Sequence, residues 1–148
     1  MKRKRNDATP KPKLGYLVFI SHSARDQWLA RQMARVIESK GRQHRVKSFL
    51  DEKDIESGDH IHESIRDSIR GCDEFMVLLT RRSASRAWVL IEMGAAWVLR
   101  KRVVAVIEDM TPEELPDIIF PYKAVDINKF DEYLNEIMRR AKKKRGKA

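Results

Sequence analysis

The chain lacks the features that mark secreted and membrane-spanning proteins. It has a single cysteine, Cys72, among 148 residues, which excludes an intrachain disulfide. No apolar run reaches the roughly 18 residues that a transmembrane helix needs. The basic residues 1–5 are not followed by the apolar stretch of a secretory signal peptide. We therefore expect a cytoplasmic protein with no membrane partner, and a Cys72 that fills space in the core.

The residues that build metal and phosphate sites are also scarce. The six glycines are scattered and form no phosphate-cradling loop. His60 and His62 lack further ligands at the spacing of a zinc site. The acidic loop that starts at Asp51 fails the calcium pattern, because Lys53 and Ile55 occupy ligand positions. We expect no metal and no resident cofactor.

Charge is plentiful but unevenly distributed. Residues 1–13 carry a net charge of +5 and residues 139–148 carry +7, so residues 14–138 carry −3 of the total of +9. These figures predict one mildly acidic domain over residues 14–138, between a disordered basic tail (1–13) and a second basic tail (139–148). Such tails bind polyanions weakly and with strong salt dependence.

Strand and helix patterns alternate along the domain. Short apolar runs predict five strands, at residues 16–20, 46–50, 75–79, 103–107 and 124–127. Helical periodicity predicts four helices, at residues 24–39, 61–71, 87–99 and 130–138. This alternation is typical of an α/β fold with a parallel sheet between two helical layers. We predict a flavodoxin-like three-layer sandwich with strand order 2-1-3-4-5.

In that strand order, a crevice is expected where the chain reverses direction between strands 1 and 3. Residues 21–25 and residues 80–88 form the loops there, and the second loop leads into a helix that carries Glu92. Glu92 is the only charged residue in residues 87–99. Trp88, Glu92 and Ala96 share one side of this helix, because residues four apart lie on one face. A buried carboxylate is costly, so Glu92 is either structurally paired at the core edge or kept for chemistry.

Three segments resemble boxes of the Toll/interleukin-1 receptor (TIR) domain, in its stand-alone prokaryotic form. They are residues 16–23, 49–58 and 85–92, the last similar to the Ser-x-x-Trp-x-x-x-Glu segment of the family. Leu17 replaces an Asp of the animal receptors, Ser57 replaces the proline of the animal BB loop, and Phe130 is the nearest counterpart of the third box. These departures argue against an animal-type adaptor.

The resemblance implies an enzyme that cleaves the nicotinamide–ribose bond of NAD⁺ with Glu92 as the catalytic carboxylate. The products would be nicotinamide and either ADP-ribose or a cyclic ADP-ribose isomer. NAD⁺ is then a substrate, with no cofactor needed. Because the chain has no room for a further sensor or effector domain, the resemblance favours a Thoeris-like module of antiphage immune signalling. Its partners would be further copies of itself or other TIR or effector proteins.

Several other residues are candidates for binding the substrate, each with a structural alternative. Trp88 either stacks on nicotinamide or is a core aromatic. Ser21, His22 and Ser23 either hold ribose or pyrophosphate, or cap the following helix. Arg81 either neutralises phosphate or lies on a solvated loop. Two further candidates are Ser85, which is also a plausible N-cap, and Asp51 of the BB loop.

Two other functions remain open at this point. The first is a non-enzymatic TIR module that assembles through the BB loop. The second is a relative of the nucleoside deoxyribosyltransferases, which share the fold type and the glycosidic chemistry. Such a relative would cleave nucleosides and leave NAD⁺ intact.

Overall fold

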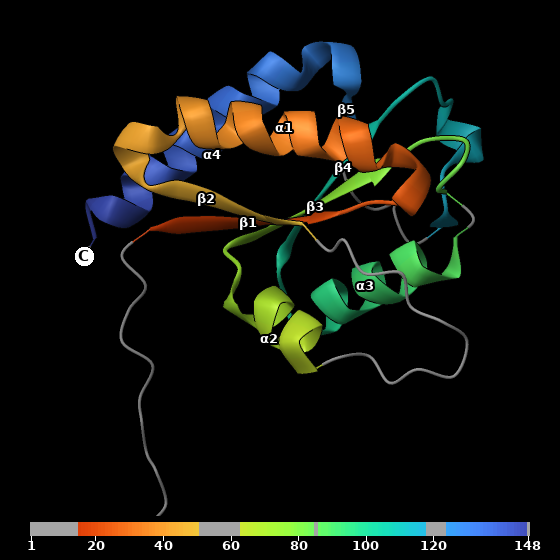
Figure 1. The fold of residues 1–148 in the computed structure, drawn as a ribbon, viewed down its shortest axis with the longest axis horizontal. Coiled ribbons are helices and arrows are strands. Elements are labelled where there is room, and N and C mark those ends of the chain that lie inside the picture. The colour runs from red at the N-terminus through yellow and green to blue at the C-terminus, as the bar shows by residue number, and fades with distance from the viewer. Residues whose placement is uncertain (1–14, 51–62, 85, 118–123, 148) are drawn as a thin grey trace, which may run out of the picture.

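The computed structural model describes residues 15–50, 63–84, 86–117 and 124–147, which form one sheet covered by helices (Figure 1). Five strands lie in the order β2-β1-β3-β4-β5, and every neighbouring pair is parallel. The strands are Tyr16–Ser21 (β1), Val46–Leu50 (β2), Glu74–Leu79 (β3), Arg102–Ile107 (β4) and Val125–Asp126 (β5). The predicted fold class and strand order are confirmed.

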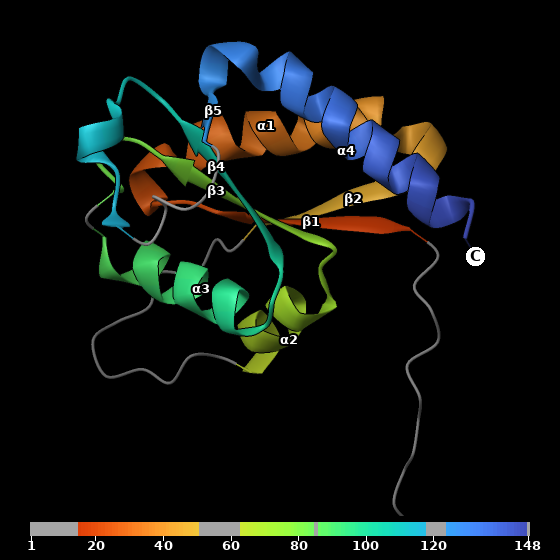
Figure 2. The same ribbon diagram turned by 180° about the vertical axis from the view of Figure 1, so that it is seen from behind.

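Helices cover both faces of this sheet in pairs (Figure 2). The α-helices are Gln27–Lys40 (α1) and Phe130–Arg145 (α4) on one face, and Glu63–Gly71 (α2) and Ala87–Val98 (α3) on the other. Short 3₁₀ turns are Ala24–Asp26 (η1), Arg42–His44 (η2), Pro112–Glu114 (η3) and Ile127–Lys129 (η5). No helix within the described ranges is both long and apolar enough to cross a membrane.

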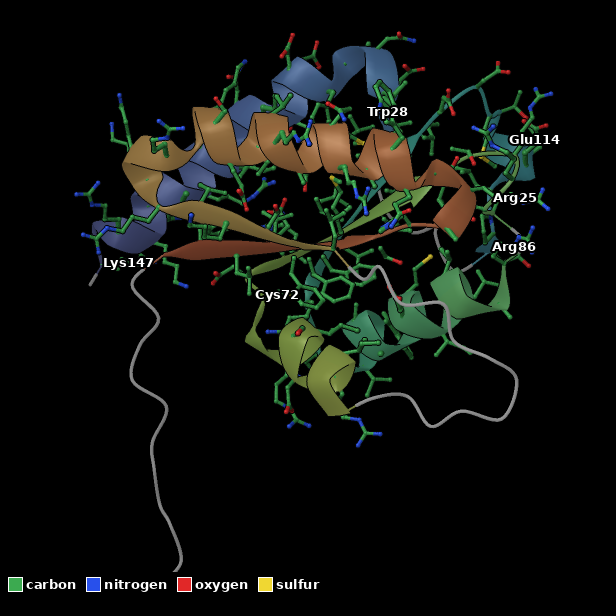
Figure 3. The ribbon with its side chains drawn as sticks, in the orientation of Figure 1. Arg25, Trp28, Cys72, Arg86, Glu114 and Lys147 are labelled. Atoms are coloured by element: carbon green, nitrogen blue, oxygen red, sulfur yellow. The ribbon has the colours of Figure 1, made fainter. Side chains whose placement is uncertain are left out.

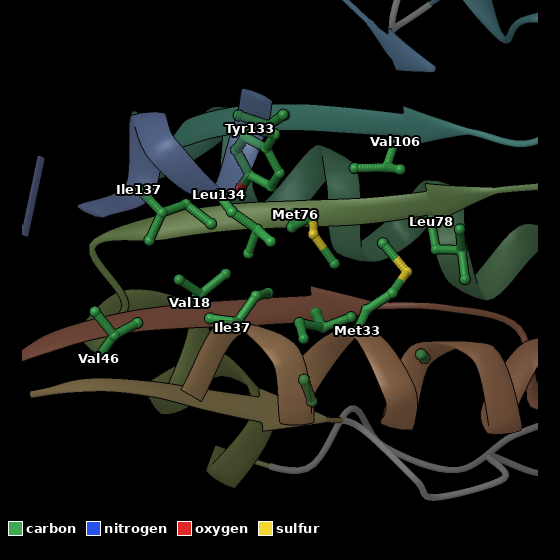
Figure 4. Close-up of a cluster of buried hydrophobic side chains, with 14 of the residues drawn as sticks. Val18, Met33, Ile37, Val46, Met76, Leu78, Val106, Tyr133, Leu134 and Ile137 are labelled. Atoms are coloured by element: carbon green, nitrogen blue, oxygen red, sulfur yellow. The ribbon is translucent and has the colours of Figure 1, made fainter. Parts of the chain in front are cut away.

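The strands contribute side chains to two separate hydrophobic cores, because successive side chains point to opposite faces of a sheet. Val18 and Met76 pack beneath α1 and α4, and Figure 4 shows this cluster. Phe19 and Phe75 pack on the other side, with α2 and α3. The ring of Phe19 stacks at 5.3 Å on both Phe49 and Phe75. Burial on both faces explains why the strands are almost continuously apolar.

The predicted helix from residue 24 is divided into a 3₁₀ turn and an α-helix. Ser23 caps η1 by accepting a hydrogen bond from the backbone N–H of Arg25, and α1 begins at Gln27. Gly41 ends α1 as expected, but with a φ of −87° it has no need of a left-handed backbone. A Cβ at this position would lie 2.4 Å from Cβ of Val46. Glycine is therefore required by the close approach of β2.

The last helix extends beyond the predicted domain boundary at residue 138. α4 continues to Arg145, so most of the predicted C-terminal basic tail is helical. Lys144 Nζ donates to the backbone oxygen of Gly15 at 2.9 Å and to the Asp73 carboxylate at 2.7 Å. Arg145 also donates to the backbone oxygen of Gln43. These contacts hold the basic end of α4 against η2 and the segments just before β1 and β3. Residues 1–14 and 148 lie outside the described residues.

The single cysteine is a core residue, as predicted. Cys72 is buried, and its Sγ donates to the backbone oxygen of Ile69 at 3.0 Å. Burial disfavours the thiolate and raises the pKa of Cys72 to about 11. A thiol in this state is a poor nucleophile at neutral pH.

Candidate active site

Buried polar side chains gather where β1 and β3 end. Of the eight polar or charged residues buried in the described part of the chain, one is Glu74 at the start of β3. The other seven lie at the end of β1 or on the loops and helices that follow β1 and β3: Ser21, His22, Ser23, Asp26, Thr80, Ser83 and Glu92. This is the switch point of the sheet, where ligands bind in open α/β folds. The edge where the crevice is predicted therefore holds most of the buried polar side chains of the described residues.

Glu92 belongs to the buried stripe of α3. The stripe consists of Val89, Glu92, Met93 and Ala96, whose spacing of three and four residues is that of one helical face. Glu92 is only 2% exposed, and its three companions are apolar. Glu92 is also the only charged residue of α3. The helix thus places one carboxylate at the core, about 8 Å along its axis from the end that faces the switch point.

The three polar residues at and after the end of β1 differ in their contacts. Ser23 caps η1, with its Oγ 3.3 Å from the backbone nitrogen of Arg25, so the capping alternative holds for this residue. His22 is buried, and its Nδ1 lies 3.4 Å from the backbone oxygen of Ile20. Ser21 is fully buried, and its Oγ has no hydrogen-bond partner among the residues described.

A hydrogen-bonded cluster connects the two loops of the switch point. Thr80 Oγ1 donates to the Asp26 carboxylate at 2.8 Å, and the Thr80 backbone N–H donates to Ser83 Oγ at 2.8 Å. Arg82 Nη2 lies 3.2 Å from the other oxygen of Asp26. A carboxylate held by a cation and a hydroxyl is structurally compensated. Asp26 therefore serves to fix η1 against the loop after β3.

Asp26, Thr80 and Ser83 were not among the predicted site residues. A signal for the last two existed, because Thr80 and Ser83 follow the third strand much as His22 and Ser23 follow the first. Asp26 could be found only from the structure, since its partner Thr80 is 54 residues away.

Arg81 does not join the cluster. Its side chain is 62% exposed, and its Nε donates to the backbone oxygen of Asp109 at 2.9 Å. Its guanidinium also lies 3.7 Å from the carboxylate of Glu114. The hydrogen bond from the backbone N–H of Thr111 lowers the pKa of Glu114, which keeps this carboxylate ionised. Arg81 thus links the loops after β3 and β4.

Two cations and Glu114 mark the rim of this edge. Figure 3 shows Arg25, Arg86 and Glu114 at the end of the molecule to which the strands point. Arg86, at the N-cap of α3, donates from Nε to the backbone oxygen of Arg82 at 3.4 Å. The rim is therefore mixed in charge.

The remaining predicted site residues are only partly placed. Trp88 lies in the first turn of α3, four residues before Glu92, but its side chain is outside the described part. Ser85, Asp51 and the His60–His62 pair lie outside the described residues. Among the residues that the structure does describe, no three His, Cys, Asp or Glu side chains come together as a metal site requires.

Comparison with known proteins supports a single family. The sequence profile described as "TIR domain" matches residues 18–139. A protein of Brachypodium distachyon named "Probable 2' cyclic ADP-D-ribose synthase BdTIR" is 26% identical over 111 residues, which cover 75% of this chain and 47% of the plant protein. The chain thus spans about half the length of the curated relative that it matches.

Solved structures show the same fold at low identity. The TIR domain of the Toll-related receptor TRR-2 from Hydra magnipapillata has a TM-score of 0.62 and 16% identity, with 84% of this chain and 97% of that domain covered. A CMP N-glycosidase of Clostridium botulinum, BcmB, has a TM-score of 0.53 and 16% identity, with 82% and 97% covered. The profile match spans most of the described sheet and helices, and the chain therefore belongs to the TIR domain family.

Proposed function

We propose that this protein cleaves the nicotinamide–ribose bond of NAD⁺, with Glu92 as the catalytic carboxylate. The observation that carries the proposal is the position of Glu92, buried on the core-facing stripe of α3 beside the switch point of a TIR-family sheet. The name of the Brachypodium relative, a probable 2′ cyclic ADP-ribose synthase, supports a product of the ADP-ribose class.

A single carboxylate suffices for this reaction. The nicotinamide of NAD⁺ is cationic, so when the bond between its nitrogen and C1′ breaks, the electron pair neutralises the ring and no acid is needed. The ribose acquires oxocarbenium character, as in glycoside hydrolysis. A carboxylate that accepts hydrogen bonds from the ribose hydroxyls stabilises this positive charge. The apolar companions Val89 and Met93 lower the local dielectric and strengthen the attraction.

The second step determines the product. Water that attacks C1′ gives ADP-ribose and releases one proton to solvent. An oxygen or nitrogen of the ADP half that attacks C1′ instead gives a cyclic isomer. Ser21 supports the binding part of the mechanism, because its buried hydroxyl can donate to a ribose or pyrophosphate oxygen.

We place the reaction in immune signalling of the Thoeris kind, with antiphage defence as the biological outcome and the cytoplasm as its location. The TIR domains of the activated Roq1 resistosome, which share the fold at 18% identity and a TM-score of 0.54, are consistent with a family role in immunity. Both that role and the product isomer depend on the proposed cleavage.

A second candidate function is a non-enzymatic interaction module. The observation that favours it is an apolar outer face of α3, where Ile91, Trp97 and Val98 are all exposed. Exposed apolar side chains of this size mark contact surfaces when they cluster. An enzyme that assembles before it acts would use the same apolar face. The face therefore does not distinguish the two functions, whereas a requirement for Glu92 does.

The test compares the wild-type protein with Glu92→Gln and with Glu132→Gln, an exposed carboxylate on α4 that serves as the matched control. Each is incubated with NAD⁺ at high protein concentration. Nicotinamide, ADP-ribose and cyclic isomers are then separated by chromatography and identified by mass spectrometry. We expect nicotinamide from the wild type and from Glu132→Gln alone. Activity that survives in Glu92→Gln, or no activity in any of the three, would overturn the proposal.

A further inference from the structure

A groove opens at the opposite end of the sheet from Glu92. It has a volume of about 700 Å³ and is formed by the start of β1, the start of β2, the last turns of α1, and η2. Parallel strands of six residues separate the two ends of the sheet by about 20 Å. Ligand sites commonly have volumes of 300–1,000 Å³, so the groove has the capacity of a binding site.

The wall of the groove is cationic. Arg35 comes from α1, Arg42 and Arg45 come from η2 and its C-cap, and Lys47 comes from β2. None of these four side chains has an ion pair or side-chain hydrogen bond with another residue in the described ranges. All four are exposed to solvent. Four unneutralised cations from three elements thus surround one concavity.

The two acids of the groove offset these cations only in part. Glu38 accepts from the backbone N–H and from Oγ of Ser48, both at 2.9 Å. Asp73 accepts from the backbone N–H of Leu17 at 2.8 Å and from Lys144 at 2.7 Å. Because the four cations outnumber the two carboxylates, and Asp73 is paired with Lys144, the electrostatic attraction of the groove is for anions.

The floor of the groove is apolar. Tyr16, Leu17 and Val46 line it, and the Tyr16 hydroxyl donates to Glu74 at 2.8 Å. A cationic wall beside apolar surface suits a ligand that combines phosphate groups with a flat organic part. The end of α4 adds positive charge nearby, since Lys144 contacts Gly15 and Lys147 lies at this end of the molecule (Figure 3).

We propose that this groove binds a nucleoside polyphosphate, at a site separate from the one that contains Glu92. The cations hold the phosphates, and the partly buried Leu17, which pairs with Lys47 in the sheet, offers apolar surface to the base. The site does not depend on NAD⁺ cleavage, because none of its residues belongs to the switch-point edge. It supplies a second nucleotide-binding surface on the same domain.

The test measures ATP binding to the full chain by titration calorimetry, in about 150 mM salt so that nonspecific attraction is screened. The groove variant is Arg35→Gln/Lys47→Gln. The matched control is Arg66→Gln/Lys129→Gln, which removes the same charge from exposed positions on α2 and just before α4. We expect affinity to fall at least tenfold in the groove variant and less than twofold in the control. Equal losses in both would overturn the site.

Three further titrations sharpen the result. ATP binding is expected to be unchanged by Glu92→Gln, which separates the groove from the proposed active site. Inorganic tripolyphosphate is expected to compete with ATP, and adenosine alone is expected to bind far more weakly. A short DNA duplex that binds while ATP does not would overturn the proposal in favour of an extended polyanion surface.

Discussion

Two buried glutamates at opposite ends of the sheet have very different surroundings. Glu74, at the start of β3, accepts hydrogen bonds from the hydroxyls of Tyr16 and Tyr133 and from two nitrogens of Arg140, at 2.7 and 3.0 Å. Glu92 lies in the second turn of an otherwise uncharged helix, on a stripe shared with apolar residues. Burial alone therefore does not identify a catalytic carboxylate. The surrounding chemistry and the position relative to the strand ends distinguish a structural acid from a candidate catalyst.

The first prediction removes the charge of the structural glutamate. Glu74→Gln leaves the largely buried Arg140 without its main counter-charge, and we expect the free energy of unfolding to fall by about 3–5 kcal/mol. Urea denaturation measures this loss. Glu136→Gln is the control, because Glu136 pairs with the same arginine at 3.3 Å but is 43% exposed. A loss below about 1 kcal/mol is expected for the control.

The second prediction removes the charge of the candidate catalyst. We expect Glu92→Gln to lower the rate of NAD⁺ cleavage by about 10²–10³-fold, the usual cost of removing one group that stabilises transition-state charge. Its unfolding free energy is expected to change by less than about 1 kcal/mol, because a neutral amide is cheaper to bury than a carboxylate. Rate assays and urea denaturation on one preparation measure both values. A loss of stability as large as that of Glu74→Gln would remove the contrast between the two glutamates.

The third prediction concerns pH. Burial, followed by the negative charge of Glu74, raises the pKa of both Tyr16 and Tyr133 above the usual value of 10.0. Above pH 10 the unfolded chain loses these protons while the folded protein retains them, so stability falls as pH rises. The slope is up to about 1.4 kcal/mol per pH unit for each tyrosine.

Urea midpoints at pH 9 and pH 11 measure this alkaline loss. A Tyr16→Phe/Tyr133→Phe variant is expected to show a smaller decrease between the two values, although it is less stable at neutral pH. An unchanged pH slope in the variant would show that the tyrosines at the Glu74 end do not cause the loss.

The smallest effect is expected at the rim of the Glu92 end. Arg81 is exposed and pairs with Asp109 and Glu114, so Arg81→Gln is expected to lower NAD⁺ cleavage by less than tenfold. Steady-state kinetics separate an effect on KM from one on kcat. A decrease as large as that of Glu92→Gln would place Arg81 among the groups that stabilise the reacting ribose.

Local patterns were sufficient for the elements and for the placement of Glu92 at the core. Apolar runs located the five strands, and helical spacing located α2 and the buried face of α4. The spacing in α3 also predicted that Glu92 would lie at the core, although the buried stripe is set by Val89 and Met93. Such periodicities act within one element, so they can be recognised without knowledge of its neighbours.

Contacts between segments that are distant in the sequence could not be predicted from these patterns. Tyr16, Tyr133 and Arg140 lie 58, 59 and 66 residues from Glu74, and no spacing rule connects them. The sequence also could not predict which way the Arg81 side chain points, because an arginine that follows a strand can turn toward either adjoining loop. Its pairing with Glu114 depends on where the loop after β4 passes.

The sequence by itself determined the α/β class, the strand order, the family boxes and the position of Glu92 as the only charged residue in residues 87–99. The class follows from the order of apolar and polar residues along the chain, the strand order from the rules of parallel crossovers, and the family boxes from particular residues at fixed spacing. The tertiary structure alone decided which residues surround Glu74, which serine caps a helix, and where four cations surround a groove at the start of β1 and β2. The physical reason is that hydrogen bonds and ion pairs need atoms within about 3 Å of each other. Only the folded chain brings residues so far apart in the sequence to that distance.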